Sequence, residues 1–143
     1  MKPLYTAVAT ARGGREGEVV SDDGVLDLSL RHPEALGGPG GEHTNPEQLF
    51  AAGYAACFHS ALRRVAEDRG LDIEPSEITA QVTLGVGDDS SFGLAVTLLG
   101  ALPTLDPPQG EELMQAAHQV CPYSRATRGN IEVALELAPA PGA

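Results

Sequence analysis

The hydrophobic pattern changes twice along the chain, from weak alternation to a long apolar run and back to alternation. Apolar residues alternate over residues 3–10, and after the Gly13-Gly14 turn further apolar runs at 19–20 and 25–30 predict strands. Asp23-Gly24 predicts a hairpin with a type I′ turn, which needs positive φ at both central residues. The first part of the chain therefore predicts three short strands.

Two helices are predicted after a glycine-rich loop. Asn45 suits the N-cap of the first helix and Gly70 its end, and the apolar run over 49–58 has no polar face. A helix of this kind is buried on every side. The other strands and one further helix are too few to cover it, so the pattern predicts a homodimer. The second helix follows Pro107-Pro108 and should end or kink near Cys121-Pro122.

Clean alternation returns on either side of the second helix. Residues 78–86 and 92–98 predict two strands joined by a polar turn, and residues 131–137 predict a half-exposed last strand. The resulting order, β-β-β-α-β-β-α-β, predicts an α+β fold with antiparallel sheets. We expect one domain over 1–143, with a loose tail at 138–143.

Composition and charge narrow the class of partner. The 143 residues include 20 acidic and 9 basic side chains, for a formal net charge of −11. Such a charge repels phosphate backbones and anionic lipid surfaces, so we expect neither nucleic acid nor a membrane as partner. No apolar run reaches the ~18 residues of a membrane span, and the start lacks the apolar stretch of a secretory signal. These features predict a soluble, cytoplasmic protein.

The two cysteines are the first candidates for chemistry, and their positions leave several interpretations open. Cys57 is either a core residue or a protected nucleophile, which would need a nearby cation because burial raises the pKa of a thiol. Cys121 is either a packing residue or a reactive thiol at a helix N-terminus. The spacings Cys57-x-His59 and His118-x-x-Cys121 also allow a metal site, although they do not form a zinc-finger pattern.

Three stretches together indicate a family. ARGGREG followed by SDDG, GGPGGEHTNPEQLFAAGYAACFHSAL, and CPYSRATRGNIEV resemble the organic hydroperoxide resistance proteins within the OsmC-like family. The resemblance implies an intertwined α+β homodimer with active sites at the subunit interface. It implies a thiol peroxidase that reduces organic hydroperoxides in oxidative stress and needs no metal or other bound cofactor. By this resemblance Cys57 is the peroxidatic cysteine, Cys121 the resolving cysteine, Arg15 the cation that holds the thiolate, and Glu47 the partner of Arg15.

The implied chemistry suits these residue types. A Cys57 thiolate that attacks a hydroperoxide becomes a sulfenic acid, which condenses with Cys121 to a disulfide. A dithiol then reduces the disulfide, typically a lipoyl-bearing protein in this family. Ten residues separate Glu47 from Cys57, about 15 Å along a straight helix, so we expect Arg15 and Glu47 to reach Cys57 from the partner subunit. Arg125 stands where family members often have Asn.

The aromatic residues bear on the substrate. An apolar entrance would favour alkyl, aryl or fatty-acid hydroperoxides over hydrogen peroxide, and its candidate lining residues are Phe50, Tyr54, Phe58, Phe92 and Tyr123. Three other interpretations remain: the sister OsmC branch with another substrate, a dimeric redox sensor without turnover, and a zinc site. The sequence carries no basic recognition helix, which disfavours the sensor.

Overall fold

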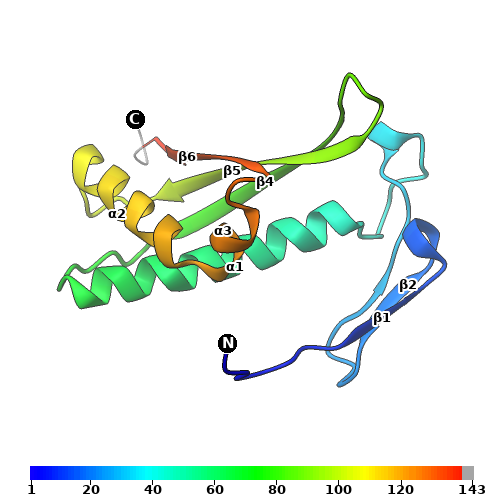
Figure 1. Cartoon of the computed structure of the whole chain (residues 1–143), viewed down its shortest axis with the longest axis horizontal. Helices are drawn as coiled ribbons and strands as arrows, with labels where there is room; N and C mark the ends of the chain where they lie inside the picture. Colours follow the sequence, from blue (N-terminus) through cyan, green and yellow to red (C-terminus); the bar gives the residue numbers. More distant parts are fainter. Residues whose placement is uncertain (140–143) are drawn as a thin grey trace. The chain divides into compact units, whose positions relative to one another are not determined.

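The computed structural model describes residues 1–139, so most of the expected tail at 138–143 lies outside the described residues. The chain separates into two compact units, Met1–Leu49 and Phe50–Ala143, and each is described by itself. The elements follow the predicted order, with one short helix added after the second long helix (Figure 1). The expectation of a single domain stays a prediction.

The first unit is a small antiparallel sheet. It consists of β1 (Ala9–Arg12), β2 (Glu18–Ser21) and β3 (Asp27–Ser29), in the order β1-β2-β3. The three predicted strands are confirmed with different bounds: β1 and β3 are shorter than the predicted runs, whereas β2 extends one residue beyond 19–20 at each end. Two single-turn 3-10 helices, Gly14–Glu16 and Glu34–Leu36, complete the regular structure of this unit.

The hairpin between β2 and β3 is confirmed, but the predicted type I′ turn is wrong. Gly24 has a φ of 74°, whereas Asp23 does not have a positive φ. The Asp23 carboxylate instead accepts hydrogen bonds from the Ser21 hydroxyl and the Val25 N–H, at 2.6 and 3.0 Å. Side-chain bonding of this kind stabilises a turn without left-handed backbone at the aspartate.

The first long helix, α1 (Pro46–Asp68), begins and ends where the sequence predicts. The Asn45 side chain accepts a hydrogen bond from the Gln48 N–H at 2.8 Å, which confirms the N-cap. After the helix, Gly70 has a φ of 67° and the Leu71 N–H donates to the Ala66 carbonyl at 2.8 Å. A left-handed glycine with this bond is a common way to end a helix.

The single chain buries α1 on one face only, as the prediction of a homodimer expects, and burial of the other faces against a second copy stays a prediction. One face is buried, and it carries Tyr54, Phe58, Leu62 and Ala66. The face with Ala52 and Ala56 is exposed. The sheet and the other helices of the second unit lie on one side of α1, so they cover one face only.

The second unit contains a three-stranded sheet of mixed direction. Its strands β4 (Glu77–Val86), β5 (Phe92–Ala101) and β6 (Glu132–Leu137) lie in the order β4-β5-β6 (Figure 1). The β4–β5 hairpin is antiparallel as predicted, but β5 and β6 are parallel, so the expectation of antiparallel sheets is wrong at this pair. The reason is the crossover through α2 (Pro107–Val120) and α3 (Pro122–Thr127), which lets β6 run in the direction of β5.

One apolar core joins this sheet to the helices. Alternate residues of β6 point away from it and are exposed, namely Glu132, Ala134 and Glu136, which confirms the half-exposed last strand that the pattern predicts. Cys121 belongs to the core, which also contains Tyr54, Phe58, Leu62, Ala66, Ile73, Val96, Leu98, Leu102, Leu113, Met114 and Ala117. The core therefore places one of the two thiols inside packed apolar side chains.

The surface carries no feature of a membrane span in the described part of the chain. Within residues 1–139, no helix is both long and apolar enough to cross a bilayer.

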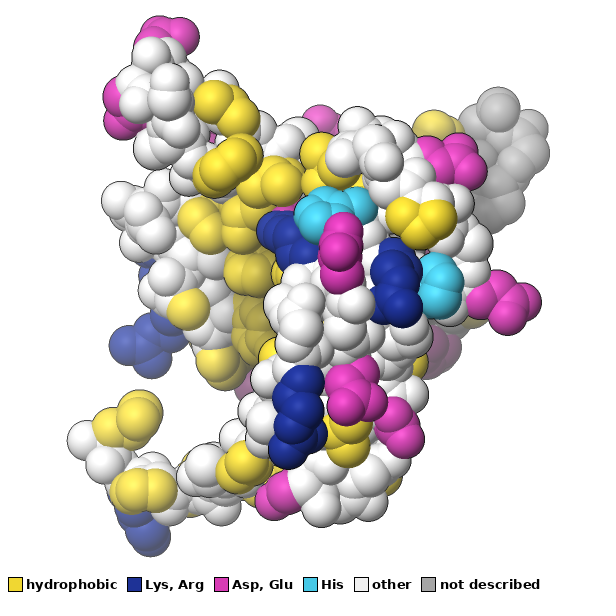
Figure 2. Space-filling view, turned by 90° about the vertical axis from the view of Figure 1, so that its right-hand side faces the viewer, with side chains coloured by type: hydrophobic (Ala, Val, Ile, Leu, Met, Phe, Trp, Pro, Cys, Tyr) yellow, Lys and Arg dark blue, Asp and Glu magenta, His cyan; other side chains and the backbone are white. Residues whose placement is uncertain are grey.

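On the face that Figure 2 shows, Lys and Arg side chains lie apart from one another or beside acidic side chains and do not form one broad basic patch.

Candidate active site

The two thiols lie side by side in the second unit. Cys57 comes from the middle of α1, and Cys121 comes from the junction between α2 and α3. Both are free, their sulfur atoms are 3.6 Å apart, and the Cys121 thiol donates toward the Cys57 sulfur. A disulfide bond is about 2.05 Å long, so a small movement of one side chain would join them.

The two thiols differ in their access to solvent. Cys121 is completely buried, with 0% of its surface exposed, whereas Cys57 is only half-buried. A dissolved reactant can therefore reach Cys57 first, and Cys121 is placed behind it.

The chain reaches this arrangement through a helix break at Cys121. Pro122 disfavours helical backbone in the residue before it, and Cys121 has an extended conformation with ψ of 124°. Its N–H donates to the Ala117 carbonyl, and its carbonyl accepts from the Arg125 N–H at 3.0 Å. Cys121 therefore closes α2 and opens α3, which confirms the predicted helix end near Cys121-Pro122. Its side chain makes no capping bond, which leaves the sulfur to face Cys57.

The surroundings of Cys57 act on its acidity in opposing directions. Burial raises the pKa of the Cys57 thiol, the backbone N–H of Tyr123 lowers it by donating to the sulfur, and the neighbouring Cys121 thiol raises it. The net shift is upward, and none of these groups is a cation. The second unit alone therefore favours the protonated thiol, although a thiolate is the nucleophilic form.

The first unit contains a two-bond ion pair between Arg15 and Glu47. The two guanidinium Nη atoms donate to the two carboxylate oxygens at 2.8 and 2.6 Å. The Arg15 side chain is 35% exposed and the Glu47 side chain 16%. Hydrogen bonding from Arg15 lowers the pKa of Glu47, and hydrogen bonding to Glu47 raises the pKa of Arg15. This is the fork geometry that holds an arginine in one rotamer.

Local backbone structure explains where these two side chains sit. Arg15 is the central residue of the 3-10 turn Gly14–Glu16, whose Gly13 has a φ of 79°. The next glycine, Gly17, allows the chain to close behind the turn, because a Cβ there would overlap the Arg12 carbonyl oxygen. Glu47 lies in the first turn of α1, where the helix dipole favours a carboxylate.

The aromatic candidates for a substrate pocket differ in their packing and in their exposure to solvent. Phe50, Tyr54 and Tyr123 form an aromatic cluster with ring centroids 5.7 to 6.3 Å apart. Tyr54 and Phe58 are fully buried, and Tyr123 is 40% exposed. Phe92 is 75% exposed at the start of β5. Tyr123 is thus the residue of this cluster that is best placed to meet a ligand from solvent.

Sequence reasoning missed two contributors near the thiols. The Tyr123 N–H carries no side-chain signal, although Pro122 at the first helical position leaves that donor free to point outward. Ser124 was also missed, and it accepts or donates hydrogen bonds with Tyr54 and His118 deep in the core. The short block CPYS, which includes both residues, could have indicated them.

The cysteine and histidine spacings do not converge on a metal site. His59 Nε2 bonds to the Ser76 hydroxyl at 2.9 Å, and His118 Nδ1 bonds to the Ser124 hydroxyl at 2.7 Å. Across residues 1–139, no three His, Cys, Asp or Glu side chains gather closely enough to hold an ion.

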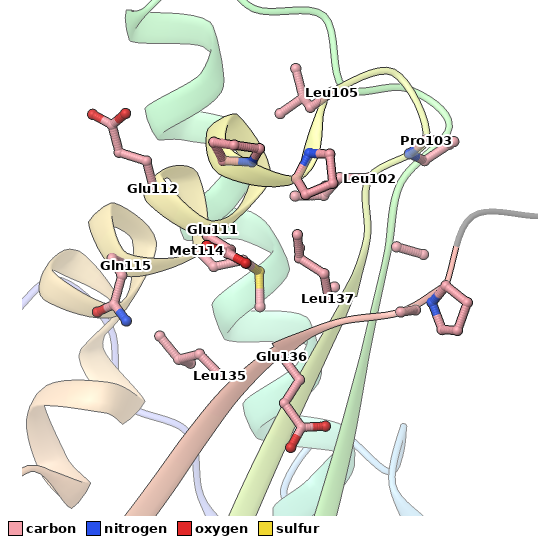
Figure 3. A pocket seen from close by; sticks show the side chains of 16 residues that line it. Leu102, Pro103, Leu105, Glu111, Glu112, Met114, Gln115, Leu135, Glu136 and Leu137 are labelled. Carbon is pink, nitrogen blue, oxygen red and sulfur yellow. The ribbon is translucent and has the colours of Figure 1, made fainter.

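A hollow of about 980 Å³ lies at the other end of the core, where α2 begins and β5 and β6 end. Figure 3 shows its apolar lining, including Leu102, Met114 and Leu137. No cysteine is among the lining residues, so this hollow is separate from the thiol pair.

The fold and the paired thiols define an α+β protein with the geometry of a dithiol redox site. A family model described as OsmC-like protein matches residues 38–136. The chain is 54% identical over 138 residues to the organic hydroperoxide resistance protein of Xanthomonas axonopodis pv. citri, covering 96% of each. The chain therefore belongs to the OsmC-like family, in its organic hydroperoxide resistance group, which confirms the resemblance.

Solved structures show the same fold. The crystal structure of an organic hydroperoxide resistance protein from Legionella pneumophila matches with a TM-score of 0.90 and 48% identity, covering 96% of this chain and 100% of that one. The structure of OhrB from Bacillus subtilis matches with a TM-score of 0.87 and 51% identity, covering 95% and 100%.

Proposed function

We propose that this protein is a thiol-dependent peroxidase that reduces organic hydroperoxides to alcohols and so detoxifies them. The observation that carries the proposal is the pair of free thiols 3.6 Å apart, with Cys57 half-buried and Cys121 completely buried. The relatives described above, which are named for organic hydroperoxide resistance, support this choice of substrate class.

The difference in burial supports the two roles that we propose for the cysteines. The Cys57 thiolate attacks the distal oxygen of the hydroperoxide, the O–O bond breaks, and the alkoxide leaves and takes a proton to become the alcohol. Cys57 is then a sulfenic acid. The Cys121 sulfur attacks it, an S–S bond replaces the S–O bond, and the hydroxide leaves as water with the thiol proton. A dithiol, such as a lipoyl group on a partner protein, reduces the disulfide by exchange.

The thiolate needs a positive charge, and we propose that Arg15 supplies it. Burial raises the pKa of Cys57, and the second unit offers no cation among the groups that shift it. Arginine stays protonated in a partly buried site and can face sulfur with one edge while it binds Glu47 with another. Glu47 then offsets the cost of placing that charge in an apolar site.

We propose that the active protein is an intertwined homodimer in which Arg15 and Glu47 of one subunit serve Cys57 of the other. The exposed face of α1 around Ala52 and Ala56 supports the dimer, because apolar helix surface of this kind is stabilised by burial against a second copy. In this assembly the two units of the chain work as one functional domain. The ten-residue spacing between Glu47 and Cys57 favours the partner over the same subunit.

The aromatic cluster supports a preference for apolar peroxides. Tyr123 is exposed beside the turn that carries Cys121, and it packs against Phe50 and Tyr54. An aromatic wall of this kind would contact an alkyl or aryl group and offers nothing comparable to hydrogen peroxide. We therefore expect cumene hydroperoxide to be reduced more efficiently than hydrogen peroxide under matched conditions.

Consumption of tert-butyl hydroperoxide with dihydrolipoamide as reductant tests the proposal. We expect rapid turnover by the wild type, none by Cys57→Ser, and impaired turnover by Cys121→Ser. Thr79→Ser, a substitution on the exposed side of β4, is the control for the effect of a substitution as such. Turnover that is equal in wild type and Cys57→Ser would overturn the peroxidase assignment.

A further inference from the structure

A chain of buried hydrogen bonds crosses the junction that carries Cys121. The Tyr54 hydroxyl lies 2.8 Å from the Ser124 hydroxyl and 3.3 Å from the Thr127 hydroxyl. The Ser124 hydroxyl also lies 2.7 Å from His118 Nδ1. Tyr54 and Ser124 are 0% exposed, and Thr127 is 3% exposed. We call these four side chains the hydroxyl chain.

Residues of the hydroxyl chain lie three positions from each cysteine in the sequence. Tyr54 precedes Cys57 by three residues in α1, about one helical turn. His118 precedes Cys121 by three residues in α2, and Ser124 follows it by three in α3. The hydrogen bonds therefore tie the helix of Cys57 to the chain on both sides of Cys121.

Other bonds at the junction do not set the distance between the two sulfur atoms. The backbone of Cys121 is bonded only within α2 and α3, to Ala117 and Arg125, and its side chain caps neither helix. Two hydrogen bonds between oxygen atoms link α1 to α3 within residues 1–139. Both involve the Tyr54 hydroxyl, with Ser124 and Thr127 as its partners. The position of α3 along α1, and with it the direction of the Cys121 sulfur, depends on this link and on the aromatic packing of Tyr123.

The state of His118 favours an intact chain. Burial lowers the pKa of His118, and the charge of Arg128 lowers it further. A neutral imidazole can accept from the Ser124 hydroxyl, which leaves the Ser124 oxygen free to accept from Tyr54. Arg128 also donates to the His118 backbone carbonyl at 2.6 Å, which fixes the end of α2.

We propose that Tyr54, Ser124 and His118 are positioning residues for disulfide closure between Cys57 and Cys121. Their hydrogen bonds include neither sulfur atom, and they act by holding α3 so that the Cys121 sulfur lies beside the Cys57 sulfur before oxidation. In the closing step the Cys121 sulfur displaces hydroxide from the Cys57 sulfenic acid, and the thiol proton leaves with it as water. The kinetic part of this inference rests on the proposed function, whereas the geometric part does not. Preorganisation of this kind raises the effective concentration of one thiol toward the other.

The equilibrium of the Cys57–Cys121 disulfide with dithiothreitol tests the geometric part. We expect Tyr54→Phe and Ser124→Ala each to weaken the disulfide about fivefold, the size expected when one net hydrogen bond is lost. The matched control is Ser76→Ala, which removes a different serine–histidine bond, the one to His59 of α1. Lower stability shared by the reduced and oxidised forms does not move this equilibrium, so a merely structural role would leave it unchanged. Tyr54→Phe keeps the buried ring and guards against misfolding of the serine variant.

The competition between disulfide closure and overoxidation tests the kinetic part. With excess tert-butyl hydroperoxide, we expect both variants to accumulate more Cys57 sulfinic acid than wild type or Ser76→Ala, while Ser124→Ala keeps the wild-type rate of the first oxidation of Cys57. If both variants show the same exchange equilibrium and the same level of overoxidation as the wild type, the inference is overturned. A wild type that exchanges with dithiothreitol but consumes no hydroperoxide would instead overturn the proposed function alone.

Discussion

The two pairs of functional candidates are built in contrasting ways. Cys57 and Cys121 meet within a packed core, where α1, α2 and α3 fix both backbones. Arg15 and Glu47 meet in a unit with almost no core, since Leu30 is the one buried hydrophobic side chain described in Met1–Leu49. Apolar packing and the buried hydroxyl chain therefore set the thiol geometry, and a two-bond ion pair sets the arginine geometry.

One unit positions the two thiols, and the other unit contains a permanent positive charge. The second unit places the sulfur atoms but raises the pKa of the attacking thiol, chiefly by burial. The first unit holds a guanidinium that cannot lose its charge at neutral pH. Loss of the Arg15 charge should therefore affect chiefly acidity and rate, whereas substitutions in the core of the second unit should affect stability and sulfur geometry.

The largest effect should follow loss of the arginine charge. Arg15→Ala should lower the rate of Cys57 oxidation by tert-butyl hydroperoxide about a hundredfold at neutral pH, because loss of the cation raises the pKa of Cys57 and so leaves less of the reactive thiolate. Arg15→Lys should fall between, since lysine keeps the charge but not the fork. Thiolate absorbance against pH, together with stopped-flow oxidation rates, measures both quantities. Arg12→Ala on the exposed strand β1 is the control, and an unchanged pKa of Cys57 in Arg15→Ala would refute the assigned role.

A smaller effect should follow a methyl group placed between α1 and α3. A Cβ at Gly53 would lie 2.7 Å from the Tyr123 hydroxyl oxygen, so Gly53→Ala should lower the free energy of unfolding by about 1 to 3 kcal/mol. Elsewhere in a helix the same change adds about 1 kcal/mol of stability. The sign of the change therefore reports the contact.

Urea unfolding measures the effect of Gly53→Ala, and a second substitution isolates its cause. Tyr123→Phe removes the nearest atom, leaving ring carbons at 3.2 Å, so it should restore part of the loss in the double variant. If Gly53→Ala stabilises the protein, the close packing of Tyr123 on α1 is absent in solution.

The smallest effect should come from Glu47→Gln, and it should depend on pH. Arg15 lowers the pKa of Glu47 in the folded protein, so the ion pair stabilises the fold above the ordinary glutamate pKa of about 4.3 and ceases to do so as the pH falls through the folded value. At neutral pH we expect a loss of about 1 kcal/mol in the free energy of unfolding.

Unfolding at neutral and acidic pH, at one protein concentration, measures this loss. Glu74→Gln removes the exposed ion pair with Arg63 and should cost less, because both side chains are more than half exposed. A deficit in Glu47→Gln that grows toward acidic pH would contradict the assigned direction.

The sequence predicted the elements better than their environment. Caps and breakers such as Asn45, Gly70 and Pro122 act within a few residues, so the bounds of α1 and the break at Cys121 followed from local chemistry. The parallel pairing of β5 and β6 depends on how a crossover packs, which no local pattern encodes. The exposed Ala56 face of α1 was expected to need a second copy of the chain, because periodicity reports hydrophobicity and cannot say which chain covers it.

The sequence likewise predicted the residues of the candidate site better than their spatial arrangement. Cys57 and Cys121 were singled out as thiols, but nothing in their spacing fixes a distance of 3.6 Å, since it arises where α1 and α3 pack together. Ser124 was missed because a serine in a short helix looks like a surface residue until its partners are known. Roles for Arg15 and Glu47 came from family resemblance, because a turn arginine and a helix-start glutamate are ordinary surface residues on pattern alone.

Stoichiometric oxidation of the reduced protein tests the central claim most directly. One equivalent of cumene hydroperoxide per chain is added without reductant, and thiols and disulfide-linked peptides are quantified by alkylation and mass spectrometry. We predict that both thiols disappear together and that a peptide linking Cys57 to Cys121 of one chain appears. Unreacted thiols, or a disulfide that joins two chains, would contradict the account.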